Sequence, residues 1–360
     1  MNTNAYYLNH EQVANLIKIN GANQTILVQG EMGIGKSTIG KMLDEMLPQH
    51  RFCYVDCTTK DLGDLQLPMI KDLEGNDFVR FAPNEEMGVH LDGPVIIMLD
   101  EFGKANPAVK QGLTALMLER KLGVHKLHPD SIVFATTNLG AEGVGDLLVA
   151  HQTNRITTVT MRKPTHMEWI EYGINKGVDH TLLGWCKDNP QLFQSFEDVG
   201  RPDDNPYIFH PQAQRTAFVT PRSLEKASGW LQQREYLDDQ SLTAALMGTI
   251  GARGAMDLMA FVALADHLPS LDSIKNNPET AKVPDNAAAV CMVVYRTLAT
   301  IEADWVDQWM TYMLRLSTEA QGLFANGVRA PRYRAQSAVM TNKAFTTWAR
   351  INGYLFAADC

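Results

Sequence analysis

Nine consecutive residues, 30–38, have the composition and spacing of a phosphate-binding loop. The first eight fit the pattern G-x-x-x-x-G-K-[ST]. Glycines let such a loop wrap a polyphosphate so that backbone N–H groups face its oxygens, and the amino end of the following helix adds positive potential. Lys36 would reach the β- and γ-phosphates, and Ser37 would be a ligand of Mg²⁺. The other reading is a glycine-rich turn that arose by chance. The candidate nucleotide-binding residues are Gly30, Glu31, Met32, Gly33, Ile34, Gly35, Lys36, Ser37 and Thr38.

Two neighbouring carboxylates, Asp100 and Glu101, follow the apolar run 95–99. An apolar run of this kind predicts a buried strand, which would place both side chains at the carboxyl edge of a parallel sheet, where α/β sheets bind ligands. Asp100 would hold Mg²⁺ directly or through water, and Glu101 would orient and deprotonate an attacking water. Alone the pair is a weak signal, but about 65 residues after a complete phosphate-binding loop it has the position of a Walker B element.

Asn138 ends another apolar run, 132–137. From a strand inserted between the two motif-bearing strands, its amide would hydrogen-bond the γ-phosphate or the attacking water. The plain reading is a turn residue before Gly140, but the presence of both motifs favours the functional one.

Two arginines are candidates for stabilising charge on the transferred phosphate. Arg155 precedes the apolar run 156–161, and Arg222 follows Thr220-Pro221 at the start of a predicted helix. Phosphoryl transfer needs positive charge on the γ-phosphate at the transition state, and an arginine often supplies it. Both residues are also compatible with an ordinary place on the surface.

The elements that must position these residues alternate between strand and helix over the first 160 residues. This alternation predicts an α/β fold with a doubly wound, mostly parallel, five-stranded sheet. A turn-rich segment inside 69–83 predicts a β-hairpin before the third strand. The predicted strands are 26–29, 52–56, 95–99, 132–137 and 156–161, and the predicted helices include 39–47 and 107–120.

Beyond residue 163 the sequence predicts helices at 167–176, 181–187 and 222–236, with polar breaks at 200–211 and 267–285. We therefore expect a nucleotide-binding core at 1–163, an α-helical lid at 164–267 and a helical extension at 268–360. One later stripe at helical spacing indicates core packing, or less simply a face for a partner: Trp305, Trp309, Tyr312, Met313 and Leu316.

The overall composition is that of a soluble globular protein, with 45% hydrophobic and 20% charged residues in 360. A net charge of -9 argues against nucleic-acid binding as a default. There is no run of about 18 apolar residues, so no membrane-spanning helix is expected, and the polar start lacks an apolar signal core. Five scattered cysteines form no zinc motif and indicate reduced thiols in a cytoplasmic protein.

Taken together, these motifs resemble those of AAA+ ATPases, with the Walker A loop, Walker B pair, Asn138, Arg155 and Thr220-Pro221-Arg222 in order. Within that superfamily the chain resembles the MoxR branch and its dynein-related relatives. The segment 100–120 is similar to that branch's segment after Walker B, as are the predicted hairpin and the Gly93-Pro94 that follows it. The resemblance covers about residues 10–230.

The resemblance implies a role for each outlying residue. Asn138 becomes sensor 1, Arg155 the arginine finger that acts on ATP bound by a neighbouring subunit, and Arg222 sensor 2. Asn154 fits the family's preference before the finger, although the nearby Arg162 could substitute for Arg155. The resemblance also implies ATP and Mg²⁺ as cofactors and a homo-oligomer in the form of a hexameric ring. It further implies chaperone-like remodelling of a protein target and a von Willebrand factor A-type partner protein.

Two other functions stay open from the sequence. A nucleic-acid motor or loader is built on the same fold, and the basic, aromatic stretch near the C-terminus would serve it: Arg329, Arg332, Tyr333, Arg334, Lys343, Trp348 and Arg350. A solvated surface is the plainer reading of that stretch. A nucleotide-dependent scaffold without catalysis is the other alternative, and an intact Asp100-Glu101 pair argues against it.

Overall fold

A computed structural model of the chain shows two compact units, residues 1–163 and residues 164–360. Residues 6–73, 76–140, 154–265, 268–331 and 333–353 are described by the structure. Each unit has hydrophobic clusters of its own.

The first unit is built on a five-stranded sheet in the order β2-β5-β8-β1-β9, in which every neighbouring pair is parallel. The predicted α/β fold is confirmed, and each strand ends within one residue of its predicted range. The order is that of a P-loop NTPase sheet, with β8 between the two strands that carry the Walker motifs. The strands are β1 (Ile26–Gln29), β2 (Arg51–Asp56), β5 (Val95–Asp100), β8 (Ile132–Thr137) and β9 (Thr157–Thr160).

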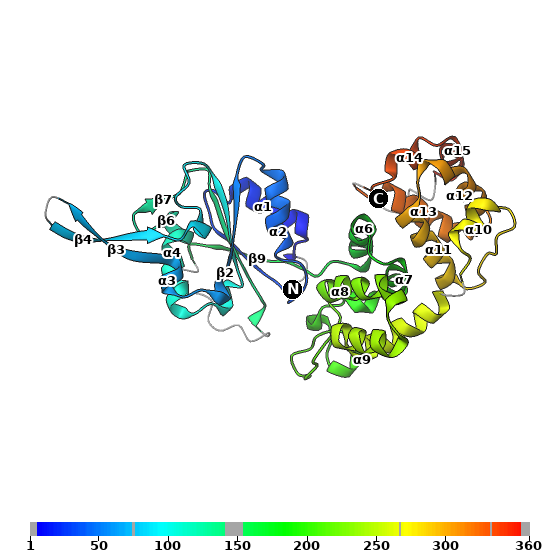
Figure 1. Ribbon diagram of the computed structural model, residues 1–360, viewed down its shortest axis with the longest axis horizontal. Helices are drawn as coiled ribbons and strands as arrows, with labels where there is room; N and C mark the ends of the chain where they lie inside the picture. The colour runs from blue at the N-terminus through cyan, green and yellow to red at the C-terminus, as the bar shows by residue number, and fades with distance from the viewer. Residues whose placement is uncertain (1–5, 74–75, 141–153, 266–267, 332, 354–360) are drawn as a thin grey trace. The chain divides into compact units, whose positions relative to one another are not determined.

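Helices cover both faces of this sheet, which explains why its central strands are almost wholly apolar. Successive side chains of β5 point to opposite faces, so Ile96 and Met98 pack toward α1 and α2, whereas Ile97 and Leu99 pack toward α4. Figure 1 shows α1 and α2 on one side of the sheet and α3 and α4 on the other. The helices are α1 (His10–Asn20), α2 (Thr38–Met46), α3 (Leu62–Leu65) and α4 (Pro107–Glu119).

A two-stranded antiparallel hairpin, β3 (Gln66–Leu73) and β4 (Asn76–Pro83), projects from the first unit away from the main sheet (Figure 1). The predicted hairpin is confirmed, although it begins three residues earlier than expected. A smaller hairpin, β6 (Lys121–Leu122) with β7 (His125–Lys126), lies against its base, where Nε2 of His125 is 3.4 Å from the carbonyl oxygen of Phe81.

The second unit is helical in its described part, and one continuous core runs from Trp169 to Trp348. The aromatic stripe predicted at 305–316 belongs to this core and is at most 5% exposed, so core packing is its correct interpretation. The expected division at 267/268 falls inside this unit and stays a prediction. The helices are α6 (His166–Lys176), α7 (His180–Asp188), α8 (Pro221–Gln232), α9 (Asp239–Ala265), α10 (Leu271–Asn276), α11 (Ala287–Thr300), α12 (Val306–Met313), α13 (Thr318–Arg329), α14 (Gln336–Met340) and α15 (Lys343–Ile351).

Two details of the second unit differ from expectation. The predicted polar break 267–285 contains α10, a six-residue helix whose N-cap Ser270 accepts from the N–H of Ser273. By length and composition, helix α9 is long and apolar enough to cross a membrane. The sequence, which has no uninterrupted run of about 18 apolar residues, had predicted no such helix. Length and composition are weak evidence, since core helices of soluble proteins pass the same test, and α9 is interrupted at Gly251 and buries Leu246, Ile250 and Leu258 in the core.

Candidate nucleotide-binding and hydrolysis site

The phosphate-binding loop connects β1 to α2 at the carboxyl edge of the sheet. Gly33 and Gly35 have φ values of 72° and 93°, in the left-handed region that glycine adopts at low cost. His10, at the start of α1, holds the loop from outside, because its Nε2 lies 2.9 Å from the carbonyl oxygen of Ile34. A Cβ atom on Gly35 would lie 3.0 Å from that same nitrogen. The two glycines therefore allow a tight turn in the loop, and His10 fixes that turn in place.

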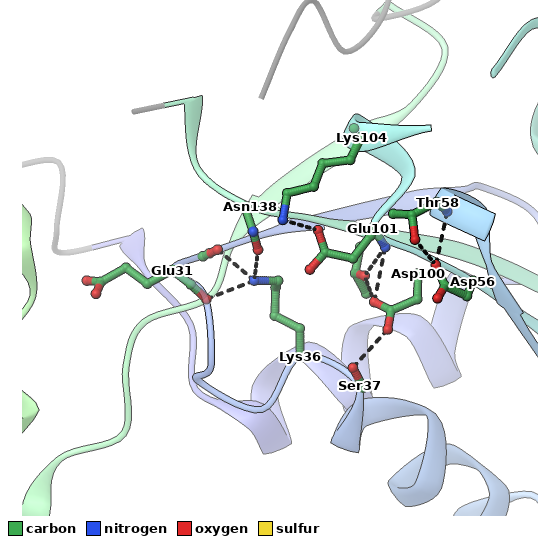
Figure 2. Close-up of polar contacts among 12 residues, drawn as sticks. Glu31, Lys36, Ser37, Asp56, Thr58, Asp100, Glu101, Lys104 and Asn138 are labelled. Carbon is green, nitrogen blue, oxygen red and sulfur yellow. Dashed lines mark hydrogen bonds and ion pairs between the residues drawn. The ribbon is translucent and has the colours of Figure 1, made fainter. Parts of the chain in front are cut away.

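Lys36 supplies a buried positive charge within the loop. Its ammonium donates to the carbonyl oxygens of Gly30 and Glu31, each at 2.8 Å, and to Oδ1 of Asn138 at 2.7 Å (Figure 2). Lys36 and Asn138 are only 5% and 1% exposed. The structure thus brings together two residues 102 positions apart. The sequence assigned Lys36 to the β- and γ-phosphates and Asn138 to the γ-phosphate or the attacking water.

Ser37 occupies the N-cap position of α2, but its side chain does not cap the helix. A serine at a helix N-cap normally accepts from the N–H groups of the first turn, yet the Ser37 hydroxyl makes no such bond and donates to Oδ2 of Asp100 at 2.9 Å. The backbone N–H groups of Thr38 and Ile39 donate instead to the carbonyl oxygens of Gly35 and Lys36, at 3.0 and 3.2 Å. The Ser37 side chain is therefore committed to Asp100 rather than to the end of the helix.

Asp100, the last residue of β5, is 5% exposed and is held by hydrogen bonds on both carboxylate oxygens. Oδ2 accepts from the hydroxyls of Ser37 and Tyr54, each at 2.9 Å. Oδ1 accepts from the hydroxyl of Thr136 and from the backbone N–H of Glu101 at 3.2 Å. These bonds hold the carboxylate in one orientation at the end of β5, where an ionised acceptor and its donors form strong hydrogen bonds.

Glu101 occupies a strained backbone position. Its φ of 53° and ψ of 34° lie in the left-handed region, which costs a non-glycine residue about 1–3 kcal/mol and is found where function fixes a side chain. The turn directs its carboxylate past the end of the strand, where Oε2 lies 3.0 Å from the ammonium of Lys104, without hydrogen-bond alignment. Figure 2 shows the side chains of Glu101, Asp100, Asn138 and Lys36 converging at this end of the sheet.

The loop residue Glu31 forms an ion pair with Lys163, at the end of the first unit. The ammonium and Oε2 are 3.1 Å apart, and the side chains are 4% and 8% exposed. Because a charge buried without its partner is costly, Lys163→Met should lower the free energy of opening of the first unit by about 3–5 kcal/mol. The measurement is hydrogen exchange of peptides covering β1 and β8, since all six tryptophans lie in the second unit and their fluorescence would not report the change.

The matched control for that substitution is Lys104→Met, which removes an ammonium from a pair whose side chains are 41% and 29% exposed. Exposed pairs contribute about 0–1 kcal/mol, so this control should barely change the exchange. Equal effects of the two variants would mean that burial of the Glu31–Lys163 pair is not what stabilises the loop.

Arg155, one of the two arginines predicted for catalysis, does not lie at this edge. Arg155 is exposed near the amino end of β9, where the N–H of Thr157 donates to the carbonyl of Thr25 at the start of β1. Thr25 and Gly30 lie at opposite ends of β1, roughly 16 Å apart at about 3.3 Å per residue. Arg155 therefore lies at the edge opposite its own phosphate-binding loop. Arg162, the alternative, follows β9 at the same edge as the loop, since the N–H of Met161 donates to the carbonyl of Gln29.

Arg222 belongs to the second unit, where it is exposed in the first turn of α8. Thr220 caps that helix by accepting from the N–H of Ser223, and Pro221 occupies the first helical position, as the sequence pattern indicated. The position of Arg222 relative to the phosphate-binding loop stays a prediction.

Two cysteines lie near the site, but neither is suited to act as a nucleophile or metal ligand. Burial, together with the carboxylates of Asp100 and Asp56, raises the pKa of the Cys57 thiol to about 12. Burial also raises the pKa of Cys53. Both are therefore neutral thiols at physiological pH, whereas metal binding and attack require the thiolate. The four described cysteines are buried and form no disulfide, in line with the sequence interpretation.

The residues present fit a magnesium ion that is shared with a nucleotide. Hard oxygen donors are available from the Ser37 hydroxyl and the Asp100 carboxylate, while Oδ1 of neighbouring Asp56 already accepts from Thr58. In the described part of the chain no group of three acidic, histidine or cysteine side chains could hold a metal alone. Mg²⁺ is typically bound in this way, by one or two protein oxygens with water and substrate phosphates completing the octahedron.

Comparisons with known proteins add only a coarse likeness. No protein-family model matches the sequence, and no curated protein matches it. Among solved structures, the chain is similar to the RuvB Holliday junction branch migration motor of Thermotoga maritima, with 16% identity, a TM-score of 0.37, and coverage of 85% of this chain and 86% of that one. It is also similar to NtrX of Brucella abortus in complex with ADP, with 12% identity, a TM-score of 0.38, and coverage of 96% and 68%. Scores this low assign neither family nor activity.

Several residues of the site were not found from the sequence. Tyr54 and Thr136 donate to Asp100, Lys104 pairs with Glu101, and Lys163 pairs with the loop. Only Thr136 had a local signal, since it lies two residues before Asn138 at the polar end of a buried strand. The arrangement as a whole offers a cation for phosphate oxygens, oxygen donors for Mg²⁺, and a carboxylate positioned to accept a proton.

Proposed function

We propose that the protein is an ATP-hydrolysing AAA+ ATPase of the MoxR type that remodels a protein target. One observation carries the proposal. Two hydrogen-bonded pairs, Lys36–Asn138 and Ser37–Asp100, lie at the same edge of the sheet as the carboxylate of Glu101. Lys36 and Asn138 would bind the terminal phosphates, Ser37 and Asp100 would hold Mg²⁺, and Glu101 would take the proton of the attacking water. Mg²⁺ would neutralise phosphate charge, which lowers the barrier to phosphoryl transfer.

In this proposal the site is completed between subunits of a ring, for which a hexamer is the expected size. Support comes from the place of Arg155, exposed at the edge of the sheet opposite its own loop, from which it cannot reach nucleotide bound by the same chain. A second copy could present it to that nucleotide. The guanidinium of Arg155 from that second copy would then stabilise the negative charge on the γ-phosphate at the transition state.

A protein target is supported by the projecting hairpin. The register pairs Ile70 with Val79 and Pro68 with Phe81, so their side chains share one face. Ile70, Val79 and Phe81 are 77%, 57% and 44% exposed. Exposed apolar surface of this kind is typical of sites that contact another polypeptide. A von Willebrand factor A-type partner and a cytoplasmic location belong to the same proposal and rest on the resemblance and on the buried free thiols.

The nucleic-acid alternative is weakened by the C-terminal aromatic residues that suggested it. Tyr333 and Trp348 are each 4% exposed and lie in the core of the second unit, where they cannot stack on bases. Arg332 lies outside the described residues. Binding to single-stranded DNA that weakens steeply with salt would revive this alternative.

The test of the shared site is ATP turnover per subunit as a function of protein concentration. The wild-type rate per subunit should rise with concentration as rings assemble. In Arg155→Ala it should stay lower by roughly 10³-fold, the size of a typical arginine-finger effect. Arg201→Ala, which removes an arginine whose side chain is 81% exposed in the second unit, is the control and should behave as wild type. A rate that is independent of both concentration and Arg155 would contradict a ring.

A further inference from the structure

Tyr54 reaches Asp100 from the neighbouring edge strand. In the register of β2 against β5, Tyr54 lies opposite Met98 and Asp56 lies opposite Asp100. Residues two apart on a strand share a face, so Asp100 is the diagonal neighbour of Tyr54, within reach of a long aromatic side chain. The tyrosine hydroxyl donates to Oδ2 of Asp100 at 2.9 Å.

This hydrogen bond is not needed to satisfy the tyrosine. Tyr54 is 48% exposed, so water could serve its hydroxyl equally well. The carboxylate, in contrast, is 5% exposed, and a bond to an ionised acceptor is stronger than one between neutral groups. The contact therefore favours a fixed orientation of Asp100.

The oxygen that Tyr54 contacts is the one that also accepts from Ser37, the other proposed ligand of the metal. Oδ2 accepts from both Tyr54 and Ser37, whereas Oδ1 is held by Thr136 and the backbone. Without the tyrosine, Oδ2 would keep only the Ser37 hydroxyl. The Ser37 hydroxyl is itself a proposed ligand of the metal, whereas Tyr54 is proposed here only as a hydrogen-bond donor to Asp100.

We infer that Tyr54 is a positioning residue for the magnesium site, which fixes the Asp100 carboxylate so that Oδ2 and the Ser37 hydroxyl present one preformed pair of oxygens. The inference rests on the proposed function, since it concerns the metal that accompanies the nucleotide. Residues that orient metal ligands in this way typically change metal affinity by roughly 10- to 100-fold when they are removed. Because Asp100 keeps three other donors, the lower end of that range is expected.

The experiment measures ADP affinity by calorimetry, with Mg²⁺ and with EDTA, for wild type, Tyr54→Phe and Tyr236→Phe. Tyr54→Phe keeps the ring and removes only the hydroxyl. It should reduce the Mg²⁺-dependent gain in ADP affinity by about tenfold and leave the affinity in EDTA unchanged. The Mg²⁺ concentration for half-maximal ATP hydrolysis should rise by the same factor. Tyr236→Phe, at a tyrosine that is 82% exposed in the second unit, should match wild type in both media.

Each other result contradicts the inference in a recognisable way. A Tyr54→Phe protein with wild-type Mg²⁺ dependence would show that the hydroxyl does not position Asp100. An equal loss of affinity with Mg²⁺ and with EDTA would indicate that Tyr54 supports the loop rather than the metal. Wild-type protein that binds no ADP in either medium would overturn the proposed function itself, before any variant is compared.

Discussion

Lys36→Ala is expected to abolish nucleotide binding, with the affinity for ATP lower by at least roughly 100-fold. The ammonium of Lys36 is a buried cation that donates to two carbonyl oxygens of the phosphate-binding loop and to Oδ1 of Asn138. Phosphate oxygens would replace some of these acceptors, and charge-assisted bonds of this kind are each worth about 1.5–3 kcal/mol. The measurement is equilibrium binding of a fluorescent ATP analogue in the presence of Mg²⁺.

The matched control for this prediction is Lys41→Ala, which removes the same charge from an exposed position on α2. It should leave the affinity unchanged. Because alanine at position 36 also removes the buried aliphatic part of the lysine, Lys36→Met, which keeps the length of the side chain but not its charge, tests whether the loss follows from the charge. Tight binding by a folded Lys36→Met protein would mean that the loop does not hold a polyphosphate at this cation.

The parts of the site that the sequence predicted are those fixed by local geometry. The phosphate-binding motif places its lysine at the carboxyl end of the strand before it. The carboxyl ends of parallel strands meet at one edge, so Lys36, Asp100 and Asn138 could be expected together. What could not be predicted depends on register and long-range packing. Tyr54 reaches Asp100 only because β2 pairs with β5 in one register, and a shift of one residue would turn it to the other face.

Other gaps have similar physical causes. Strand β3 contains Pro68, which weakens a strand pattern in the sequence. An isolated two-stranded hairpin nevertheless has edges that tolerate proline. Helix α10 is too short for its periodicity to be recognised. The Glu31–Lys163 ion pair joins residues that no local pattern relates. The assignment of Arg222 depends on how two separately packed units meet, which no motif specifies.

Glu101→Gln is expected to keep ATP bound while its hydrolysis falls by roughly 10²- to 10⁴-fold, the contribution of a general base. Glutamine has the shape of glutamate but cannot accept a proton at neutral pH, and the groups that bind phosphate and metal, Lys36, Ser37 and Asp100, are left intact. Single-turnover hydrolysis and ATP affinity, measured on the same preparation, separate the two effects.

Loss of the carboxylate also removes the partner of Lys104, so a second variant must separate the two consequences. Lys104→Ala breaks the same ion pair but keeps the carboxylate of Glu101, and because the pair is partly exposed its hydrolysis rate should stay within about fivefold of wild type. If Glu101→Gln hydrolysed ATP normally, Glu101 would not be the base. If wild type and Glu101→Gln both retained ATP without turnover, the chain would be a nucleotide-dependent scaffold, and the left-handed backbone of Glu101 would then serve only the turn that ends β5.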